Sequence, residues 1–169
     1  MSELWPQANV GNVGRLRALA AGFPGSAYTE RHIPVPFEQV WDYFSDMERS
    51  VPSFDETVAE FHITNRDDNR LTAKVRGPFL PIRFTLDVDL DVGWCLMTAR
   101  PAYYLVMFAA EPSGDHTRFA HAEACNLPGP TVLRRPIQPL FRLARRWLVG
   151  HVERDVDGLE LALGLTGDK

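Results

Sequence analysis

Cysteine and net positive charge are both scarce in this sequence. Cys95 and Cys125 are its only cysteines, and neither a CxxC motif nor a Cys/His zinc spacing occurs. Two isolated thiols are typical of a reducing compartment. The formal net charge is -4, which argues against a nucleic-acid partner, because nucleic-acid binding usually rests on a strongly basic surface.

Long apolar runs are absent as well. No stretch approaches the roughly 18 apolar residues that cross a bilayer. The first residues, MSELWPQANVGNV, lack the basic and apolar regions of a secretory signal. We therefore expect a cytoplasmic protein without a transmembrane segment. Its 169 residues suit one domain with a sizeable core.

Residues 1–26 differ in composition from the rest of the chain. The segment VGRLRALAAG predicts a short helix with Leu16 and Leu19 on one face, and glycine and proline at 22–25 end it. We interpret 1–26 as an N-terminal extension, a loosely packed arm ahead of a domain at 27–165. A lid or a partner-docking helix is the alternative.

Residues 27–125 predict a strand, two short helices and six further strands. AYTERHI at 27–33 has strand character, and the apolar spacing after Pro36 is helical, with Trp41 on the apolar stripe. From residue 56 onward, apolar and polar residues alternate, most clearly in IRFTLDVDLDV at 82–92. Turn signals divide this region into strands centred near residues 60, 73, 87, 96, 106 and 121. A sheet with one apolar face is usually antiparallel.

The last element is a long amphipathic helix. Residues 137–163 carry charged side chains on one face, and Trp147 and Leu148 belong to the apolar stripe on the other. The apolar faces of this helix and of the sheet need mutual cover. The fold class is therefore α+β, with the helix across an antiparallel sheet and Trp41 buried.

Three segments resemble a known superfamily. They are IPVPFEQVWDYFSDME at 33–48, the turn GDHTR at 114–118, and DVDGLE at 155–160. Their order and spacing resemble the START-like or SRPBCC superfamily, which includes the Bet v 1 relatives and the bacterial polyketide cyclase/dehydrase families. The resemblance covers roughly residues 27–165.

The resemblance implies a helix-grip fold, in which a seven-stranded antiparallel sheet wraps around the long C-terminal helix and encloses a cavity. Members of the superfamily bind lipids, sterols, polyketides and other hydrophobic molecules. Some catalyse cyclisation, aromatisation or dehydration, whereas others only bind or sequester a ligand. The superfamily has no universal catalytic motif, so the resemblance assigns no catalytic residue.

The segment TRFAHAEAC at 117–125 is unusual for a strand. Phe119, His121 and Glu123 share one face, and alanines occupy the other. If the alanines face the interior, the histidine and glutamate are solvated and carry no site. In the superfamily the residue after Thr-Arg tends to point inward, which favours Phe119, His121 and Glu123 lining the cavity, although a one-residue bulge would reverse this.

The first strand pairs with the last in this superfamily. Arg31 shares a face with Ile33, so we expect it across from His121 and Glu123. A carboxylate kept ionised by the guanidinium would raise the pKa of the imidazole. The trio then forms either a general base, with His121 and Glu123 as catalytic residues, or a buried ion network without catalytic function.

The long helix and the tyrosines supply further ligand-binding candidates. His151 and Asp155 are one turn apart and close to Trp147. They either contact the ligand or form a structural hydrogen-bonded pair. Tyr103 and Tyr104 are adjacent, so one should face inward, where it either offers its hydroxyl to a ligand carbonyl or packs against a neighbouring strand.

Arginines near the start of this helix, among them Arg142 and Arg146, form either a solvated face or a docking patch for an acyl carrier protein. No recognised metal-ligand spacing joins His121, Glu123 and His151, so we expect neither a metal nor a cofactor. The sequence thus predicts a domain that binds a hydrophobic, polyketide-type or lipid-like molecule. This domain is either a cyclase/aromatase or a non-catalytic transport or sequestration protein.

Overall fold

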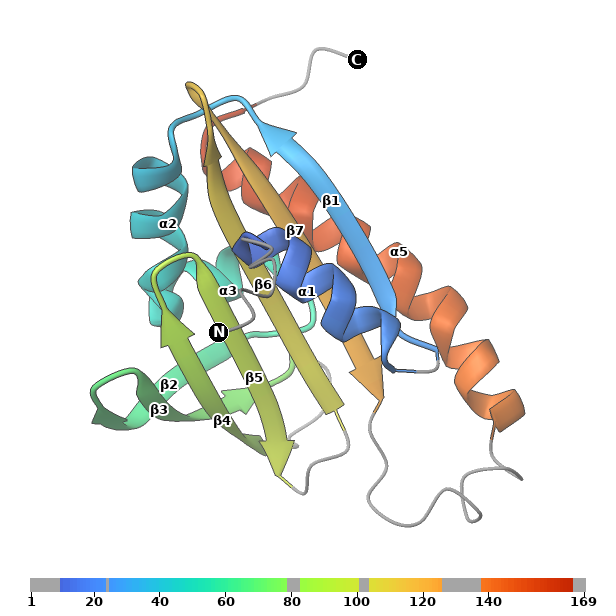
Figure 1. The fold of residues 1–169 in the computed structure, drawn as a ribbon. Coiled ribbons are helices and arrows are strands. Elements are labelled where there is room, and N and C mark those ends of the chain that lie inside the picture. Colours follow the sequence, from blue (N-terminus) through green and yellow to red (C-terminus); the bar gives the residue numbers. More distant parts are fainter. Residues whose placement is uncertain (1–9, 24, 79–82, 101–103, 126–137, 166–169) are drawn as a thin grey trace, which may run out of the picture.

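The computed structural model describes residues 10–165, except 24, 79–82, 101–103 and 126–137, and it leaves out the side chains of 138–144. The described chain forms eleven elements (Figure 1). The helices are α1 (Asn12–Ala21), α2 (Phe37–Ser45), α3 (Met47–Phe54) and α5 (Gln138–Ala162). The strands are β1 (Ala27–Ile33), β2 (Glu60–Asp67), β3 (Arg70–Arg76), β4 (Arg83–Asp91), β5 (Trp94–Arg100), β6 (Tyr104–Ser113) and β7 (His116–Cys125).

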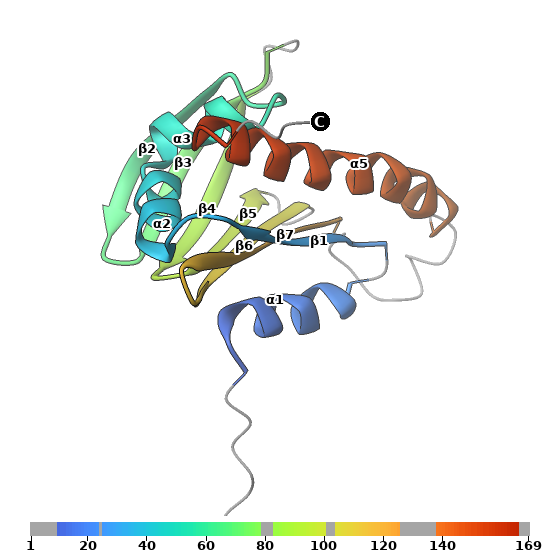
Figure 2. The same cartoon turned by 90° about the horizontal axis from the view of Figure 1, so that it is seen from above.

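The seven strands form one antiparallel sheet in the order β1-β7-β6-β5-β4-β3-β2. Every strand predicted from the alternating pattern is present, and β1 joins the sheet through β7 as expected. Figure 2 shows α2, α3 and α5 on one side of this sheet and α1 on the other. The structure therefore confirms the α+β helix-grip architecture.

The core between the sheet and α2, α3 and α5 is rich in aromatic rings. Phe44 of α2 packs on Phe54, Phe108 and Phe119, with ring centroids 4.8 to 6.1 Å apart. Trp41 is 7% exposed, as the helical spacing predicted. These rings stabilise the core, because offset and edge contacts between aromatic rings are favourable in addition to their burial.

Helix α5 approaches α3 closely at one glycine. A Cβ atom on Gly158 would lie 2.5 Å from the backbone oxygen of Phe54, so a larger residue would push the two helices apart. The glycine of DVDGLE therefore has a packing role. No helix in the described part of the chain is both long enough and apolar enough to span a membrane.

Helix α1 covers the outer face of β6 and β7. Val13, Leu16 and Ala20 are at most 2% exposed and pack on the alanines of β7, at positions 120, 122 and 124, and on Met107. The interpretation of this segment as a loosely packed arm is wrong for α1. The small alanine side chains let the helix lie close to the strands, so the sheet is covered on both faces here.

A network of charges joins α1 to the sheet. Glu30 of β1 accepts hydrogen bonds from Tyr28, from Arg17 of α1 and from Arg118 of β7. Burial by itself would raise the pKa of Glu30, but the three donors outweigh it and lower the pKa to about 2. The ionised carboxylate of Glu30 thus stabilises the contact of α1 with the sheet.

We expect the Glu30→Gln variant to be less stable than the wild type at neutral pH by about 1 kcal/mol, since Arg17 and Arg118 remain partly exposed and salt screens them. The Glu30 pKa is lower in the folded than in the unfolded chain. Its stabilisation is therefore present above the unfolded pKa, near 4.5, and is lost as the pH falls toward about 2. Urea unfolding at pH 7 and pH 3 measures this, and an equal difference between variant and wild type at both pH values would contradict it.

Candidate functional site

A cavity of about 360 Å³ lies between the inner face of the sheet and helices α3 and α5. Most of its wall is apolar, and this part comes mainly from α3 and from the inward positions of strands β2 to β6. Representative residues are Val51, Phe61, Leu86, Met97, Ala99 and Val106. An apolar cavity with a few polar groups is the usual form of a small-molecule site.

The ionisable groups of the cavity wall contact one another in a chain. The hydroxyl of Tyr104 donates a 2.7 Å hydrogen bond to Oε2 of Glu123. Oε1 of Glu123 lies 3.5 Å from Nε2 of His151, which lies 3.9 Å from Oδ1 of Asp55. All four residues line the cavity, so its polar surface is concentrated at one place.

Two further residues lie behind this polar surface. His121 contacts Oε1 of Glu123 through Nε2 at 3.7 Å and Oδ2 of Asp155 through Nδ1 at 3.6 Å. Asp155 in turn lies 3.4 Å from Nδ1 of His151. His121, Glu123, His151 and Asp155 therefore form a closed ring in which imidazoles and carboxyl groups alternate; we call these four residues the His-carboxyl ring.

The His-carboxyl ring is almost completely buried, each member being at most 2% exposed. Burial raises the pKa of Glu123 to about 8, although the Tyr104 hydrogen bond opposes this. Burial, together with Asp55 and Glu123 nearby, raises the pKa of Asp155 to about 9. Both shifts favour the protonated carboxyl form at neutral pH.

The imidazoles shift in the opposite direction. Burial and the neighbouring His151 lower the pKa of His121 to about 3, and burial lowers the pKa of His151. The expectation of a raised histidine pKa is therefore wrong in sign: burial dominates, and no guanidinium of the described residues forms an ion pair with Glu123. At neutral pH and without a bound cation, these shifts favour protonated carboxyl groups on Glu123 and Asp155 and neutral imidazoles on His121 and His151.

Alternation along β7 and helical spacing along α5 build the ring. His121 and Glu123 are two residues apart, so both point to the inner face of the sheet. His151 and Asp155 are four apart, so they share one face of α5. The two faces of TRFAHAEAC are both buried: His121 and Glu123 lie beneath α5, and the alanines lie beneath α1.

The structure does not bring Arg31 to the ring. Arg31 lies opposite Phe119 in the β1-β7 pairing, and Thr29 lies opposite His121. The guanidinium instead forms ion pairs with Asp157 and Glu160 of α5. The expected trio is wrong because the register places Arg31 two residues too far along β1, where acidic side chains of the helix are nearer.

The other expected ligand contacts divide into two groups. Tyr104, Glu123, Trp147 and His151 line the cavity. Phe119 points inward as predicted, but it belongs to the aromatic core. The cavity wall does not include Phe119, His121 or Asp155. Tyr103 falls outside the described residues.

Trp147 departs from the helix prediction. The helical spacing places it on the apolar buried stripe, yet it is 53% exposed. Its ring stacks on His151 with centroids 4.8 Å apart. The side chain therefore covers His151 at the edge of the cavity while about half of it stays exposed.

Asp55 is a cavity residue that the sequence patterns do not reveal. It directly follows α3, and its Oδ1 accepts hydrogen bonds from the backbone and hydroxyl of Thr57. That pattern in a sequence indicates only a turn. Its approach to His151 depends on the packing of α3 against α5, which no local pattern encodes.

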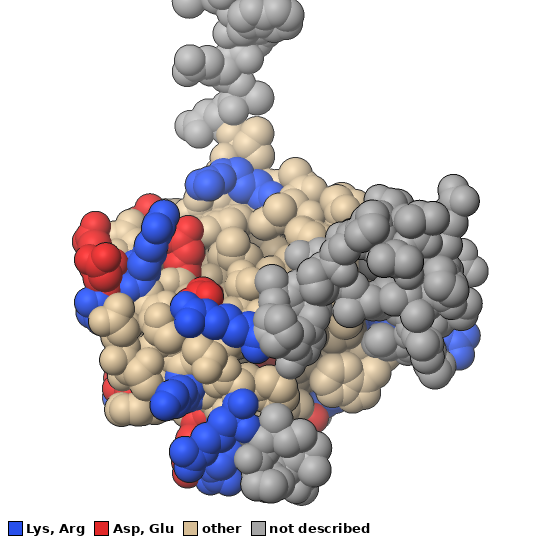
Figure 3. All heavy atoms as spheres, turned by 90° about the horizontal axis from the view of Figure 1, so that it is seen from below, with Lys and Arg blue, Asp and Glu red and all other residues tan. Residues whose placement is uncertain are grey.

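The arginines proposed for carrier docking lie at the start of α5. Arg146 is exposed, whereas the side chain of Arg142 is outside the described ones. Seen from below, Lys and Arg side chains are interspersed with acidic and uncharged ones over the described surface (Figure 3). Docking of a carrier protein at the start of α5 stays a prediction.

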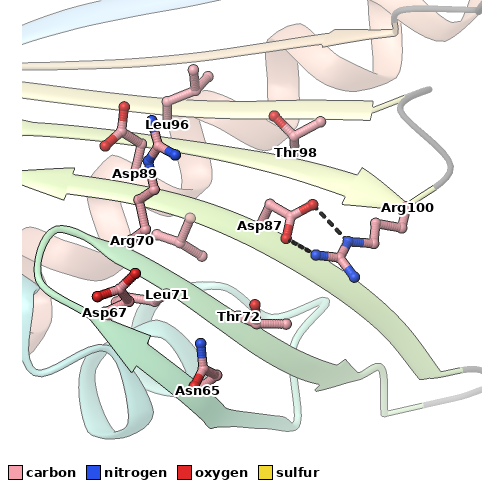
Figure 4. A pocket seen from close by; sticks show the side chains of 11 residues that line it. Asn65, Asp67, Arg70, Leu71, Thr72, Asp87, Asp89, Leu96, Thr98 and Arg100 are labelled. Carbon is pink, nitrogen blue, oxygen red and sulfur yellow. Dashed lines mark hydrogen bonds and ion pairs between the residues drawn. The ribbon is translucent and has the colours of Figure 1, made fainter.

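A second hollow, of about 460 Å³, lies on the outer face of β2 to β5 (Figure 4). Its wall is mainly polar and charged, and Arg100 pairs with Asp87 across it. It lies on the opposite face of the sheet from the His-carboxyl ring. An open, ion-paired strand surface of this kind is typical of a solvated sheet face, and we assign it no function.

No protein-family model matches the sequence, and no curated protein sequence matches it. Solved structures do match. The protein TTHA0849 from Thermus thermophilus is 20% identical with a TM-score of 0.62, over 82% of this chain and 96% of that protein. The Zhui aromatase/cyclase from Streptomyces sp. R1128 is 14% identical with a TM-score of 0.54, over 82% and 91%.

A third structure is the di-domain aromatase/cyclase StfQ from the steffimycin biosynthetic pathway. It is 8% identical with a TM-score of 0.64, over 88% of this chain and 53% of StfQ. At these identities the similarities establish the fold alone. The chain shares the fold of these two aromatase/cyclases, and this is the helix-grip architecture that the resemblance implied.

Proposed function

We propose that the protein binds an apolar small molecule with one oxygen-bearing polar end inside the cavity between the sheet and α5. The observation that carries this proposal is the distribution of groups on the cavity wall. Its surface is apolar except where Tyr104, Glu123, His151 and Asp55 meet. A ligand hydroxyl or carbonyl would find both hydrogen-bond donors and acceptors there.

The chemical class of the ligand follows from the fold and the cavity together. Two of the structural neighbours named above are aromatase/cyclases, one of them from a biosynthetic pathway for steffimycin. A polyketide-type metabolite combines apolar rings with oxygen substituents, which suits such a wall. We therefore favour a polyketide-type metabolite over a simple lipid chain as the ligand. We expect the protein to act in the cytoplasm.

Naphthalene and 2-naphthol test the proposed polar end, because they differ by one hydroxyl group. We expect 2-naphthol to bind the wild type about tenfold more tightly, since one hydrogen bond to a buried polar group is worth about 1 kcal/mol or somewhat more. The Glu123→Leu variant should lose this preference and keep naphthalene binding. Fluorescence titration of both compounds measures the ratio.

A control for this titration is Glu48→Leu, which changes an exposed carboxylate that contacts His62 away from the cavity wall. It should retain the wild-type preference. Equal affinity of the wild type for the two compounds would contradict the proposed polar end. Failure of both compounds to bind would contradict the cavity as a ligand site.

A second candidate function is conversion of the bound molecule by cyclisation, aromatisation or dehydration. It is favoured by the presence of Glu123 and His151 on the cavity wall, where they would contact a substrate directly. His121 would then act as a positioning residue through Glu123. Binding and conversion differ in one measurement: in mass analysis after incubation with a linear poly-ketone, loss of water should be faster than in a protein-free control only if the protein is an enzyme.

A further inference from the structure

The His-carboxyl ring contains buried polar atoms that lack partners. Among the described residues, neither nitrogen of His121, neither oxygen of Asp155, nor Nδ1 of His151 has a hydrogen-bond partner. Buried polar atoms nearly always have a partner, and each exception requires an explanation. Five such atoms in one cluster require a common explanation.

The nitrogen-oxygen contacts of the ring are longer than direct hydrogen bonds. Its four nitrogen-oxygen contacts measure 3.4 to 3.7 Å, whereas direct N–H···O bonds measure about 2.7–3.2 Å. Two ligands bound tetrahedrally at about 2.0–2.2 Å from one ion lie roughly 3.3–3.6 Å apart. An imidazole binds one ion through one nitrogen, so of these contacts only the 3.7 Å one between Nε2 of His121 and Oε1 of Glu123 joins two ligand atoms of the same ion, and it lies just above this interval.

The buried carboxyl groups of the ring also favour a bound cation. Glu123 and Asp155 are at most 2% exposed, and no Lys or Arg of the described chain forms an ion pair with either. Buried carboxylates require a proton or a cation as compensation. One divalent cation would neutralise both carboxylates and would bind one of the unpartnered nitrogens of His121 and one of the unpartnered oxygens of Asp155.

We propose that His121, Glu123 and Asp155 bind one divalent transition-metal ion behind the wall of the cavity. Each of the three offers one ligand atom, and these atoms lie within 4.8 Å of one another. His151 contacts both carboxylates and also lines the cavity. It therefore lies between the ion and a cavity ligand.

Glu123 shows the arrangement of a ligand supported by a neighbour. Its Oε2 accepts the Tyr104 hydrogen bond, which leaves Oε1 directed to the two histidines. Such outer hydrogen bonds orient metal ligands and strengthen binding. His121 is fixed as well, because its ring stacks on Phe108 with centroids 4.1 Å apart.

Asp55, His151 and Asp155 form a second possible triad, but Asp55 is less available. Its Oδ1 already accepts two hydrogen bonds from Thr57, and it is partly exposed. We therefore place the ion at the fully buried triad. An imidazole among the ligands favours Zn²⁺ or Fe²⁺ over Mg²⁺ and Ca²⁺, which prefer oxygen ligands alone.

The experiment titrates Zn²⁺ into full-length protein that was first dialysed against a chelator, in competition with a chromophoric chelator. We expect one Zn²⁺ per chain with a dissociation constant below about 1 μM, and Mg²⁺ binding at least about 100-fold weaker. His121→Gln, Glu123→Gln and Asp155→Asn should each weaken Zn²⁺ binding by at least about 100-fold. Tyr104→Phe should weaken it by about tenfold.

Three matched variants keep the test specific. His62→Gln changes an exposed histidine that also contacts a carboxylate, Cys125→Ser removes a nearby thiol, and Asp55→Asn alters the competing triad. All three should bind Zn²⁺ within about threefold of the wild type. Loss of binding in Asp55→Asn, or its persistence in both His121→Gln and Asp155→Asn, would overturn the assignment.

Native mass spectrometry of the wild type needs no variant that might misfold. We expect one mass increment per chain that a chelator removes, and its absence after loading with Zn²⁺ would overturn the proposal. The metal site does not rest on the proposed ligand-binding function. Naphthol titration of metal-free protein tests that function, whereas Zn²⁺ titration without naphthol tests this site.

Discussion

The Ala99→Trp variant should lose binding of 2-naphthol by at least about 100-fold while it keeps the fold of the wild type. Ala99 is buried on β5, and its side chain forms part of the cavity wall. An indole there would occupy much of the space of about 360 Å³. The cavity gives a larger side chain room that a close-packed core lacks, so we expect a stability cost of no more than about 1–3 kcal/mol.

The matched control is Thr98→Trp, one residue earlier on the same strand. Thr98 points to the outer hollow, so its replacement should leave naphthol affinity unchanged (Figure 4). Fluorescence titration measures both variants, and circular dichroism verifies their folding. If Ala99→Trp folds and still binds 2-naphthol as the wild type does, the ligand lies elsewhere.

Strong periodicity made most of the fold predictable. In IRFTLDVDLDV, apolar residues occupy every second position, and β4 has this alternation, with Leu86 and Val88 buried. The long helix was expected at residues 137–163 and is observed at Gln138–Ala162. Such patterns predict elements because a regular backbone turns a sequence period into one apolar face.

The covered outer face was not predictable by the same reasoning. Alanine is compatible with a buried or a solvated position, so the residues at 120, 122 and 124 do not reveal α1 above them. Local sequence patterns also do not determine the register in which one strand pairs with another. Arg31 therefore could be assigned to the inner face, but its partners Asp157 and Glu160 could not be foreseen.

The two halves of the candidate site were found as separate pairs. His121 and Glu123 share a strand face, and His151 and Asp155 share a helix face. Each pair follows from local spacing. Their meeting depends on where α5 crosses β7, which the close contact at Gly158 helps to set. A metal-ligand motif is absent from the sequence because the three proposed ligands come from two distant segments.

Replacing Leu16 by aspartate should undock α1 and expose the outer face of β6 and β7. Leu16 is completely buried on the alanine face, among Met107, Ala120 and Ala122. The variant loses a buried side chain and places a carboxylate in an apolar site, so we expect the free energy of unfolding to fall by about 3–5 kcal/mol. Urea unfolding measures this loss, and amide hydrogen exchange should become fast in α1 before the rest of the chain. Ala18→Asp, two residues further on the exposed side of the helix, should lower stability by only about 1 kcal/mol, because Asp is a poorer helix former than Ala and lies near the C-terminal end of α1. A loss below about 1 kcal/mol in Leu16→Asp, with α1 still protected from exchange, would show that the helix does not require its contact with the alanine face.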